Sequence, residues 1–292
     1  MMLKKILLIL AQATIIILAY IFCARPFQLK WGATLNEVSK SMVGDERIGE
    51  NPSFFATRAI TINDIPEKIW PWIIQMGYER AGFYGYDILE NLGSKMGIYS
   101  ANKILPEFQN FKTGDDLPIS PVAHLSFYAI EPYKYLTWSE DKGKYPGAFI
   151  WALYPINESQ TRLVSRIGWS YHWSEPSLIL LDLFTEFADH IAVREILKGI
   201  KGHVEGNVDS FAKQTLNFFI YLIVFMIFIF IQSVLILLPL SLSKWVMGTV
   251  SGLVWLMTWY APIPIWVGAI ASCACILFFF KEPRFLKINR LV

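Results

Sequence analysis

The sequence is poor in charged residues. Asp, Glu, Lys and Arg make up 17% of its 292 residues, whereas about 25% is usual for a soluble domain. Disordered chains combine few apolar residues with many charges, so a hydrophobic content of 54% excludes intrinsic disorder and argues against a wholly soluble protein. The net charge of +2 is small, and it predicts no nucleic-acid partner.

Cysteine is scarce as well. The three cysteines, Cys23, Cys273 and Cys275, lie in or beside long apolar segments, and the middle of the chain has none. This distribution excludes a disulfide framework or a cysteine metal site in the middle region. Cys273 and Cys275 are separated by one residue, which is not the spacing of a metal-binding pair, so we interpret them as membrane thiols.

The signatures of common catalytic and cofactor sites are also missing. The sequence has no glycine-rich phosphate loop and no Gly-x-Ser-x-Gly motif, and its four histidines do not stand at the spacing of paired metal ligands. Glu186 and His190 share one helix face, but such a pair is more typical of a solvated polar face than of a metal site. The sequence therefore predicts no catalytic residues, no metal and no cofactor, and it favours a protein that is not an enzyme.

Long apolar runs occupy both ends of the chain. Ile6–Ala24 and Phe218–Leu238 are each long enough to cross a bilayer as a helix. Trp245–Phe280 is too long for one crossing, and the two prolines of Ala261–Pro264 would break a helix. We expect a hairpin whose helices meet at this break, with one tilted and kinked crossing as the alternative. The sequence thus predicts about four transmembrane helices.

Basic residues beside short membrane segments mark the cytoplasmic side. Outside residues 25–214 the chain has one acid and seven basic residues, and the middle region has a net charge of −4. We therefore expect a multi-pass protein of the plasma membrane, with both termini cytoplasmic and the middle region extracytoplasmic. The seven basic residues are Lys4, Lys5, Lys244, Lys281, Arg284, Lys287 and Arg290.

The middle region combines helical and strand patterns in the order typical of the α+β class. Asn63 and Asp64, followed by Pro66, predict the start of a helix that ends near Gly77. A long helical pattern covers residues 177–205, as one kinked helix or as two helices. The expected strands cover residues 55–62, 125–130, 135–139, 148–154 and 162–170, and a further short helix covers 86–92.

Several motifs resemble the SRPBCC superfamily, which comprises START/Bet v1-like and polyketide cyclase-like proteins. The resemblance covers about residues 31–205. It implies a helix-grip fold, with an antiparallel sheet, a long C-terminal helix and a hydrophobic cavity between them. The superfamily includes lipid carriers, cyclases, hydrolases and co-chaperones. The motifs are Trp31–Thr34, Gly44–Glu46, Ala56–Ile62, Ile69–Gly77, Arg80–Asp87, Leu105–Gln109, Gly114–Asp115 and Thr161–Leu163.

Aromatic side chains of the expected sheet are candidates for either the core or the cavity wall. In a helix-grip fold the face that carries Phe149 and Trp151 would line the cavity. Strand alternation places Arg166 on the opposite face from Trp169, unless a bulge intervenes. The candidate ligand-binding residues are Tyr84, Asp87, Phe127, Trp138, Phe149, Trp151, Arg166, Trp169, His172 and Phe184.

These patterns predict a membrane-anchored START-like protein that binds a membrane lipid or another small hydrophobic ligand. The alternatives are a cyclase- or hydrolase-like enzyme that uses the same cavity, or a non-catalytic protein-interaction module. The predicted segments are a transmembrane anchor over 1–24, a connector over 25–50, the START/Bet v1-like domain over 51–207, a second transmembrane helix within 208–240, and a transmembrane hairpin with a basic tail over 241–292.

Overall fold

The computed structural model describes residues 2–50, 52–140, 146–169, 176–237, 239 and 241–281; for residue 2 and residues 176–184 it describes the backbone alone. The chain divides into two compact units. One unit is Leu29–Gln214, and the other combines Met1–Gln28 with Thr215–Val292. The expected cavity residues all belong to the first unit.

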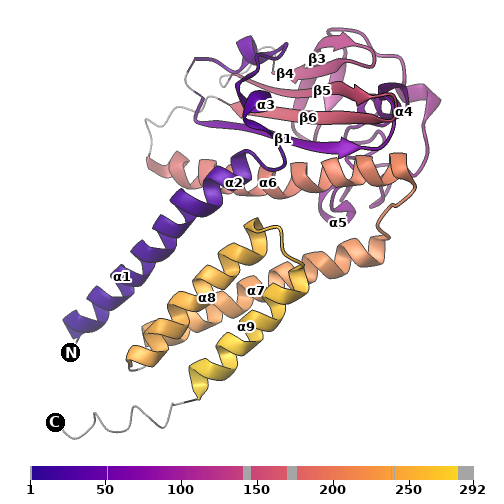
Figure 1. Ribbon diagram of the computed structural model, residues 1–292. Helices are drawn as coiled ribbons and strands as arrows, with labels where there is room; N and C mark the ends of the chain where they lie inside the picture. The colour runs from indigo at the N-terminus through magenta and orange to yellow at the C-terminus, as the bar shows by residue number, and fades with distance from the viewer. Residues whose placement is uncertain are drawn as a thin grey trace, which may run out of the picture. The chain divides into compact units, whose positions relative to one another are not determined.

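The first unit is built on one antiparallel sheet of six strands (Figure 1). The strand order is β1-β6-β5-β4-β3-β2. The first and the last strand in sequence are therefore neighbours, and β1 pairs with β6 along its whole length. Four further strands cover their predicted ranges within two or three residues, and β2 was not predicted. The strands are β1 (Phe54–Ile62), β2 (Asp116–Pro118), β3 (His124–Glu131), β4 (Tyr135–Ser139), β5 (Gly147–Asn157) and β6 (Gln160–Trp169).

One continuous helix, α6 (Pro176–Glu205), runs along one face of this sheet (Figure 1). It is held to β1 by Arg58, whose Nη1 lies 2.6 Å from Asp189 Oδ2, and by Lys201, which donates to the carbonyl of Thr61 at 2.7 Å. The helical pattern predicted over residues 177–205 is therefore one helix and not two. An antiparallel sheet with a long C-terminal helix is the α+β arrangement that the sequence predicted.

Two short helices precede the central strands. Helix α4 (Pro66–Ile74) begins at the predicted proline, but its N-cap is Ile65, and no side chain caps the first turn. Asp64 instead accepts a hydrogen bond from the amide of Ile65 at 2.8 Å. Helix α5 (Asp87–Glu90) has four residues, fewer than the predicted range of 86–92.

The apolar core of this unit lies between the sheet and the helices α4 and α6. The strands place alternate side chains on this face, and the buried faces of the two helices close it. Burial of these side chains supplies the main stabilising free energy of the unit. Representative members of the core are Ile62, Ile69, Ile73, Phe127, Trp138, Trp151, Leu163, Val193, Leu197 and Ile200.

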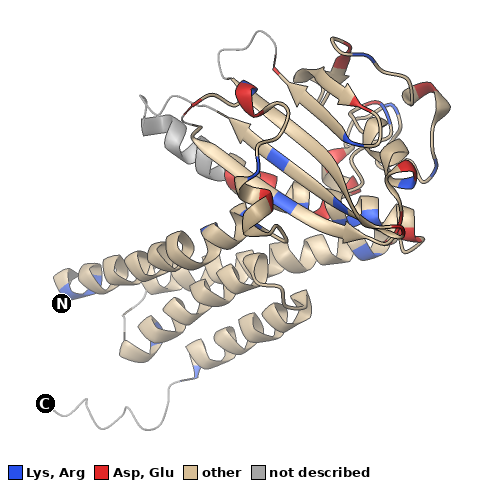
Figure 2. Ribbon diagram, turned by 45° about the horizontal axis from the view of Figure 1, so that its top comes forward, with Lys and Arg blue, Asp and Glu red and all other residues tan. Residues whose placement is uncertain are grey.

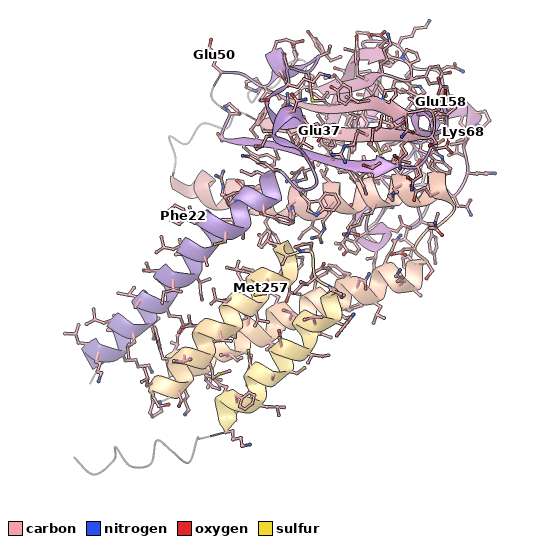
Figure 3. All side chains as sticks on the ribbon, viewed as in Figure 1. Phe22, Glu37, Glu50, Lys68, Glu158 and Met257 are labelled. Atoms are coloured by element: carbon pink, nitrogen blue, oxygen red, sulfur yellow. The ribbon has the colours of Figure 1, made fainter. Side chains whose placement is uncertain are left out.

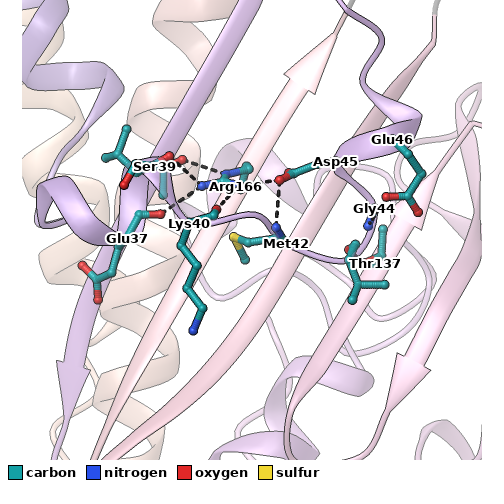
Figure 4. A network of polar contacts seen from close by, with 12 residues as sticks. Glu37, Ser39, Lys40, Met42, Gly44, Asp45, Glu46, Thr137 and Arg166 are labelled. Carbon is teal, nitrogen blue, oxygen red and sulfur yellow. Dashed lines mark hydrogen bonds and ion pairs between the residues drawn. The ribbon is translucent and has the colours of Figure 1, made fainter.

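The connector before β1 packs on the other face of the sheet (Figure 4). Its helix α3 (Leu35–Ser39) begins with a capping box, in which the side chains of Thr34 and Glu37 each accept a hydrogen bond from the other's backbone amide. Arg162 of β6 also holds Glu37, with Nε–Oε1 and Nη2–Oε2 distances of 2.8 and 2.9 Å. The connector thus forms a third layer of the unit, since the sheet lies between it and α6.

The second unit consists of apolar helices, and charged residues concentrate elsewhere (Figure 2). Two helical stretches in the described part of the chain are long and apolar enough to cross a membrane, Leu3–Leu29 and Phe211–Leu237. Phe22 in the first stretch and Met257 in the later helix α8 illustrate the exposed apolar surface of this unit, since they are 72% and 54% exposed (Figure 3). The helices are α1 (Met2–Ala19), which continues through a π-turn (Tyr20–Ala24) into α2 (Arg25–Leu29), α7 (Phe211–Leu237), α8 (Leu242–Tyr260) and α9 (Ile265–Phe280).

The chain breaks between α8 and α9, at the two prolines where the sequence predicted a hairpin. A polar cluster joins α1, α7 and α8: Gln12 donates to Gln232, and Gln232 donates to the carbonyl of Gly248 at 3.0 Å. The indole of Trp245 donates to the carbonyl of Leu8 at 2.6 Å. These bonds join the first apolar helix to the later ones, although the bonded residues are 220 and 237 positions apart in sequence.

Candidate functional site

A cavity of about 250 Å³ lies between the sheet and α6. Strands β3 to β6 form its floor, α6 forms one wall, and the segment from Phe83 to Glu90 forms another. Its lining is mainly apolar, with two acidic residues. The lining residues are Phe83, Glu90, Ile119, Leu125, Trp138, Phe149, Ile167, Trp169, Asp189, Ala192, Val193 and Ile196.

Three of the ten candidate residues meet in this cavity: Trp138, Phe149 and Trp169. Trp138 and Phe149 are cross-strand partners in the pairing of β4 with β5, so their side chains project from the same face. Their ring centroids are 5.4 Å apart. Strand alternation and register together therefore produce the aromatic floor of the cavity.

Two other candidates, Phe127 and Trp151, belong to the packed core around the cavity. Both are at most 1% exposed. Phe127 stacks on Phe111 with ring centroids 5.0 Å apart, and Trp151 packs edge-on against Phe149 at 4.7 Å. Neither lines the cavity, so these side chains support its floor.

Tyr84 and Asp87 line a different hollow, of about 490 Å³, at the carboxyl end of α6. The hydroxyl of Tyr84 accepts a hydrogen bond from Gln75 at 2.7 Å, and burial raises its pKa. Asp87 accepts from the hydroxyl of Ser100 at 2.6 Å, and burial raises the pKa of this carboxyl also. These polar groups are satisfied within the protein, outside the cavity beneath α6.

The inclusion of Arg166 among the cavity candidates is wrong. Its side chain lies on the connector face of the sheet, as strand alternation predicted, and the register of β6 with β1 and β5 has no bulge at this position. Arg166 forms an ion pair with Asp45 at 2.7 Å and donates to Thr57 at 3.0 Å. The last two candidates, His172 and the side chain of Phe184, lie outside the described residues.

Glu186 and His190 do not form a solvated face. Glu186 is 4% exposed and His190 is fully buried, because this side of α6 faces the sheet. No group of three or more metal-ligating side chains occurs within the described parts of the chain. The buried polar side of α6 is also the side that carries Asp189, the partner of Arg58.

Glu90 is the functional candidate that the sequence did not reveal. Its Oε2 accepts a hydrogen bond from the amide of Gly85 at 3.1 Å, while its Oε1 is buried and accepts none from the described residues. Burial, together with the carboxylates of Asp87 and Glu195, raises the pKa of this carboxyl to about 8. In sequence Glu90 is an ordinary polar residue of a short helix, so no local signal distinguishes it.

Two glycines make this position of Glu90 possible. A Cβ on Gly85 would stand 2.3 Å from Glu90 Oε1, so the carboxylate rests directly on the glycine backbone. A Cβ on Gly199 of α6 would stand 1.9 Å from the carbonyl oxygen of Tyr84. The missing side chains thus let the segment 83–90 approach α6 closely, which brings Glu90 into the wall of the cavity.

Comparison with known proteins gives likenesses in structure only. Searches of protein-family models and of curated proteins find no match. Among solved structures, a polyketide cyclase-like protein from Corynebacterium glutamicum is 14% identical, with a TM-score of 0.34, and the match covers 53% of this chain and 93% of that one. The Zhui aromatase/cyclase from a Streptomyces strain is 10% identical, with a TM-score of 0.35, and the match covers 54% and 96%.

A protein from Mesorhizobium loti is 15% identical, with a TM-score of 0.33, and the match covers 52% of this chain and 98% of that one. The fold of Leu29–Gln214 itself rests on the strand order and the placement of α6 described above.

Proposed function

We propose that this protein is a membrane-anchored START-like protein that binds a lipid or another hydrophobic molecule in the cavity beneath α6. The observation that carries the proposal is the aromatic and aliphatic cavity of about 250 Å³ between the sheet and α6. Ligand sites are concave and mostly apolar, with a few polar groups that orient the ligand. This cavity has that composition, with Glu90 and Asp189 as its polar groups.

The anchoring part of the proposal rests on the apolar helices. Residues 206–210 alone separate α6 from α7, and the connector joins β1 to the first apolar helix. Connections to apolar helices at both ends would keep the cavity near the membrane and raise the effective concentration of ligands dissolved there. Four crossings, cytoplasmic termini and an extracytoplasmic Leu29–Gln214 unit are part of this proposal.

A cyclase- or hydrolase-like activity is the second candidate, because Glu90 places an ionisable group in the cavity wall. The carboxylate of Asp189 is paired with Arg58, so Glu90 is the available acid among the described lining residues. Catalysis by a lone carboxyl group would require the substrate to supply the other reacting groups. Binding is therefore the function that the cavity supports best.

Filling the cavity is expected to abolish ligand binding. In an Ala192→Phe variant, the larger ring would project from α6 into the cavity. Full-length protein is purified in lipid nanodiscs, and bound apolar molecules are extracted and compared by mass spectrometry with those of empty nanodiscs. We expect molecules that are enriched on the wild-type protein and absent from Ala192→Phe.

The matched control is Ala152→Phe. Ala152 lines a hollow of about 540 Å³ on the connector side of the sheet, so the same substitution there leaves the cavity beneath α6 unchanged. Ala152→Phe should retain the enriched molecules. If the wild-type protein retains nothing above the empty nanodisc level, or if both variants retain the same molecules, the cavity is not the binding site.

The proposed membrane orientation, with cytoplasmic termini, predicts a specific pattern of cysteine labelling in intact cells. In a variant with its three cysteines replaced by serine, single cysteines are introduced at Glu158, which is exposed on the β5–β6 hairpin (Figure 3), and at Lys287 in the basic tail. A membrane-impermeant maleimide should label position 158 directly and position 287 only after permeabilisation. Labelling of position 287 in intact cells would contradict cytoplasmic placement of the tail.

A further inference from the structure

The segment that begins with α5 exposes several large apolar side chains within a short stretch of the first unit. Asp87 and Ser100 close this stretch into a loop, because Asp87 Oδ1 accepts hydrogen bonds from the amide and the hydroxyl of Ser100 at 3.1 and 2.6 Å. Compact surface loops with their ends close together are frequently functional. We call residues 87–100 the apolar loop. Its exposed apolar side chains are Leu89, Leu92, Met96 and Tyr99, which are 52%, 67%, 41% and 54% exposed.

The apolar loop presents little charge at its surface. Asp87 is buried, and the carboxylates of Asp87 and Glu90 each accept a hydrogen bond within the unit. The one basic residue of the loop, Lys95, is paired with Glu79 at 2.8 Å. Scattered apolar residues are normal on a soluble surface, whereas several together mark a site that contacts a membrane or another protein.

The first turn of α7 decides between these two partners, because it lies beside the apolar loop. The rings of Tyr99 and Phe211 pack edge to face, with centroids 4.7 Å apart. The amide of Asp87 donates to Oε1 of Gln214 at 3.4 Å. Phe211 and Gln214 belong to the opening turn of α7, which is long and apolar enough to cross a membrane. The loop is therefore held at the end of a candidate membrane helix.

The position of these contacts along α7 indicates the level of the loop relative to a bilayer. The nearly unbroken apolar part of α7 begins at Phe218, which follows Gln214 by about 6 Å along the helix axis. The headgroup layer on each side of a bilayer is about 5–7 Å thick. With Phe218 at the edge of the hydrocarbon core, Gln214 lies within the headgroup layer, and the apolar loop lies there with it.

We propose that the apolar loop rests in the headgroup layer of the membrane that α7 enters, with its four exposed apolar side chains in contact with lipid. The inference rests on the membrane-anchoring part of the proposed function. It goes further, because it assigns a membrane-contact surface to the Leu29–Gln214 unit itself. Tyr99 suits this level, since tyrosine is enriched at membrane interfaces. The long aliphatic stem of Lys95 allows its ammonium group to reach lipid phosphates.

The apolar loop also adjoins the ligand cavity. Phe83 and Glu90 both line the cavity beneath α6, and Glu90 belongs to the loop. Contact of the loop with the bilayer would therefore place one wall of the cavity beside the lipids. An apolar ligand would then pass between bilayer and protein without crossing a deep layer of water.

Nitroxide quenching in nanodiscs tests this inference. Leu92→Cys and Met96→Cys are made separately in the full-length variant whose three native cysteines are serine, and each is labelled with the fluorophore NBD. The nanodiscs contain phosphatidylcholine with or without a nitroxide close to the headgroup. Because interfacial segments bury their apolar side chains about 5–10 Å into the headgroup boundary, both loop labels should be quenched at least about fivefold more strongly than a label remote from the membrane.

Two further labels serve as controls. Val43→Cys is the matched position away from the loop, because Val43 is 43% exposed but belongs to the connector, where its carbonyl accepts from Thr137 on the face of the sheet opposite α6. Its label should keep its emission. Ile223→Cys reports on anchoring, since Ile223 is 54% exposed on the apolar part of α7. Its label should be quenched by lipids with a nitroxide on the acyl chain.

The outcomes separate this inference from the proposed function. Strong quenching at positions 92 and 96 but not at 43 supports the proposal. If only the label at position 223 is quenched, α7 enters the bilayer but the loop does not contact it, and the inference is wrong. Loop labels with blue-shifted emission but no quenching would show that protein covers the loop, and equal quenching at position 43 would show no specific contact; both overturn the proposal. Without quenching at position 223, membrane anchoring itself fails, and the inference fails with it.

Discussion

Replacing Arg166 by methionine should lower the free energy of unfolding by about 3–5 kcal/mol, the usual cost of removing one partner of a buried charged pair. Its guanidinium is 2% exposed and donates to the carbonyls of Glu37, Val38 and Lys40, each at 2.9 Å, besides Asp45 and Thr57 (Figure 4). Methionine fills similar space but satisfies none of these acceptors. Thermal unfolding of the full chain in nanodiscs, followed by near-UV circular dichroism, measures the loss.

A lysine at this position should not restore stability, because an ammonium group cannot reproduce the planar fork of the guanidinium. Arg162→Met is the control on the same strand. Arg162 also holds the connector, but its side chain is 19% exposed, so its loss should cost about 1–2 kcal/mol. Limited proteolysis adds a local readout, since cleavage within residues 29–50 should accelerate in Arg166→Met. Unchanged stability together with unchanged cleavage would show that Arg166 does not fasten the connector.

Arg58→Met should destabilise the protein by a similar amount, about 3–5 kcal/mol, because it leaves the carboxylate of Asp189 unpaired beneath α6. The two side chains are 1% and 9% exposed. Removing both charges should be much less harmful, since apolar residues of similar volume often replace a buried ion pair at little cost. We therefore expect the double variant Arg58→Met/Asp189→Leu to unfold within about 1 kcal/mol of the wild-type protein.

A double-mutant cycle over the four proteins measures this coupling. The single variant Asp189→Leu completes it, and it should be destabilised because Arg58 then lacks its carboxylate. If the double variant loses the sum of the two single losses, the pair contributes no coupling and the arrangement of α6 over β1 does not depend on it. Asp189 also lines the cavity. If the Asp189→Leu protein is less stable but retains its bound ligand, the ion pair contributes to folding and not to binding.

Local patterns in the sequence predict much of the secondary structure. The strand β4 has its predicted bounds, and Pro66 begins α4 as expected. These predictions succeed because strand alternation and helix-start signals depend on residues a few positions apart. The strand β2, with three residues, was missed since so short a strand has no period to detect. Alternation also predicts the correct face for Arg166, which contradicts its inclusion among the cavity candidates.

Other features depend on residues that are far apart in sequence. Glu186 and His190 fit a solvated face by their spacing, yet both are buried, because only the folded structure shows which side of α6 meets the sheet. The aromatic residues of the sheet divide between lining and core for the same reason. Trp138 borders the cavity, while its neighbour Trp151 is enclosed by other rings. Both residues have the same local pattern.

By itself, the sequence determined the class of the domain, the apolar character of its flanking helices and the proline break between α8 and α9, since each depends on composition or on short-range periodicity. Only the tertiary structure decided that a cavity exists and that Glu90 belongs to its wall. That position requires Gly85 beneath the carboxylate and Gly199 of α6 against the carbonyl of Tyr84. Contacts between residues more than 100 positions apart arise only when the chain has folded, so no local pattern could indicate them.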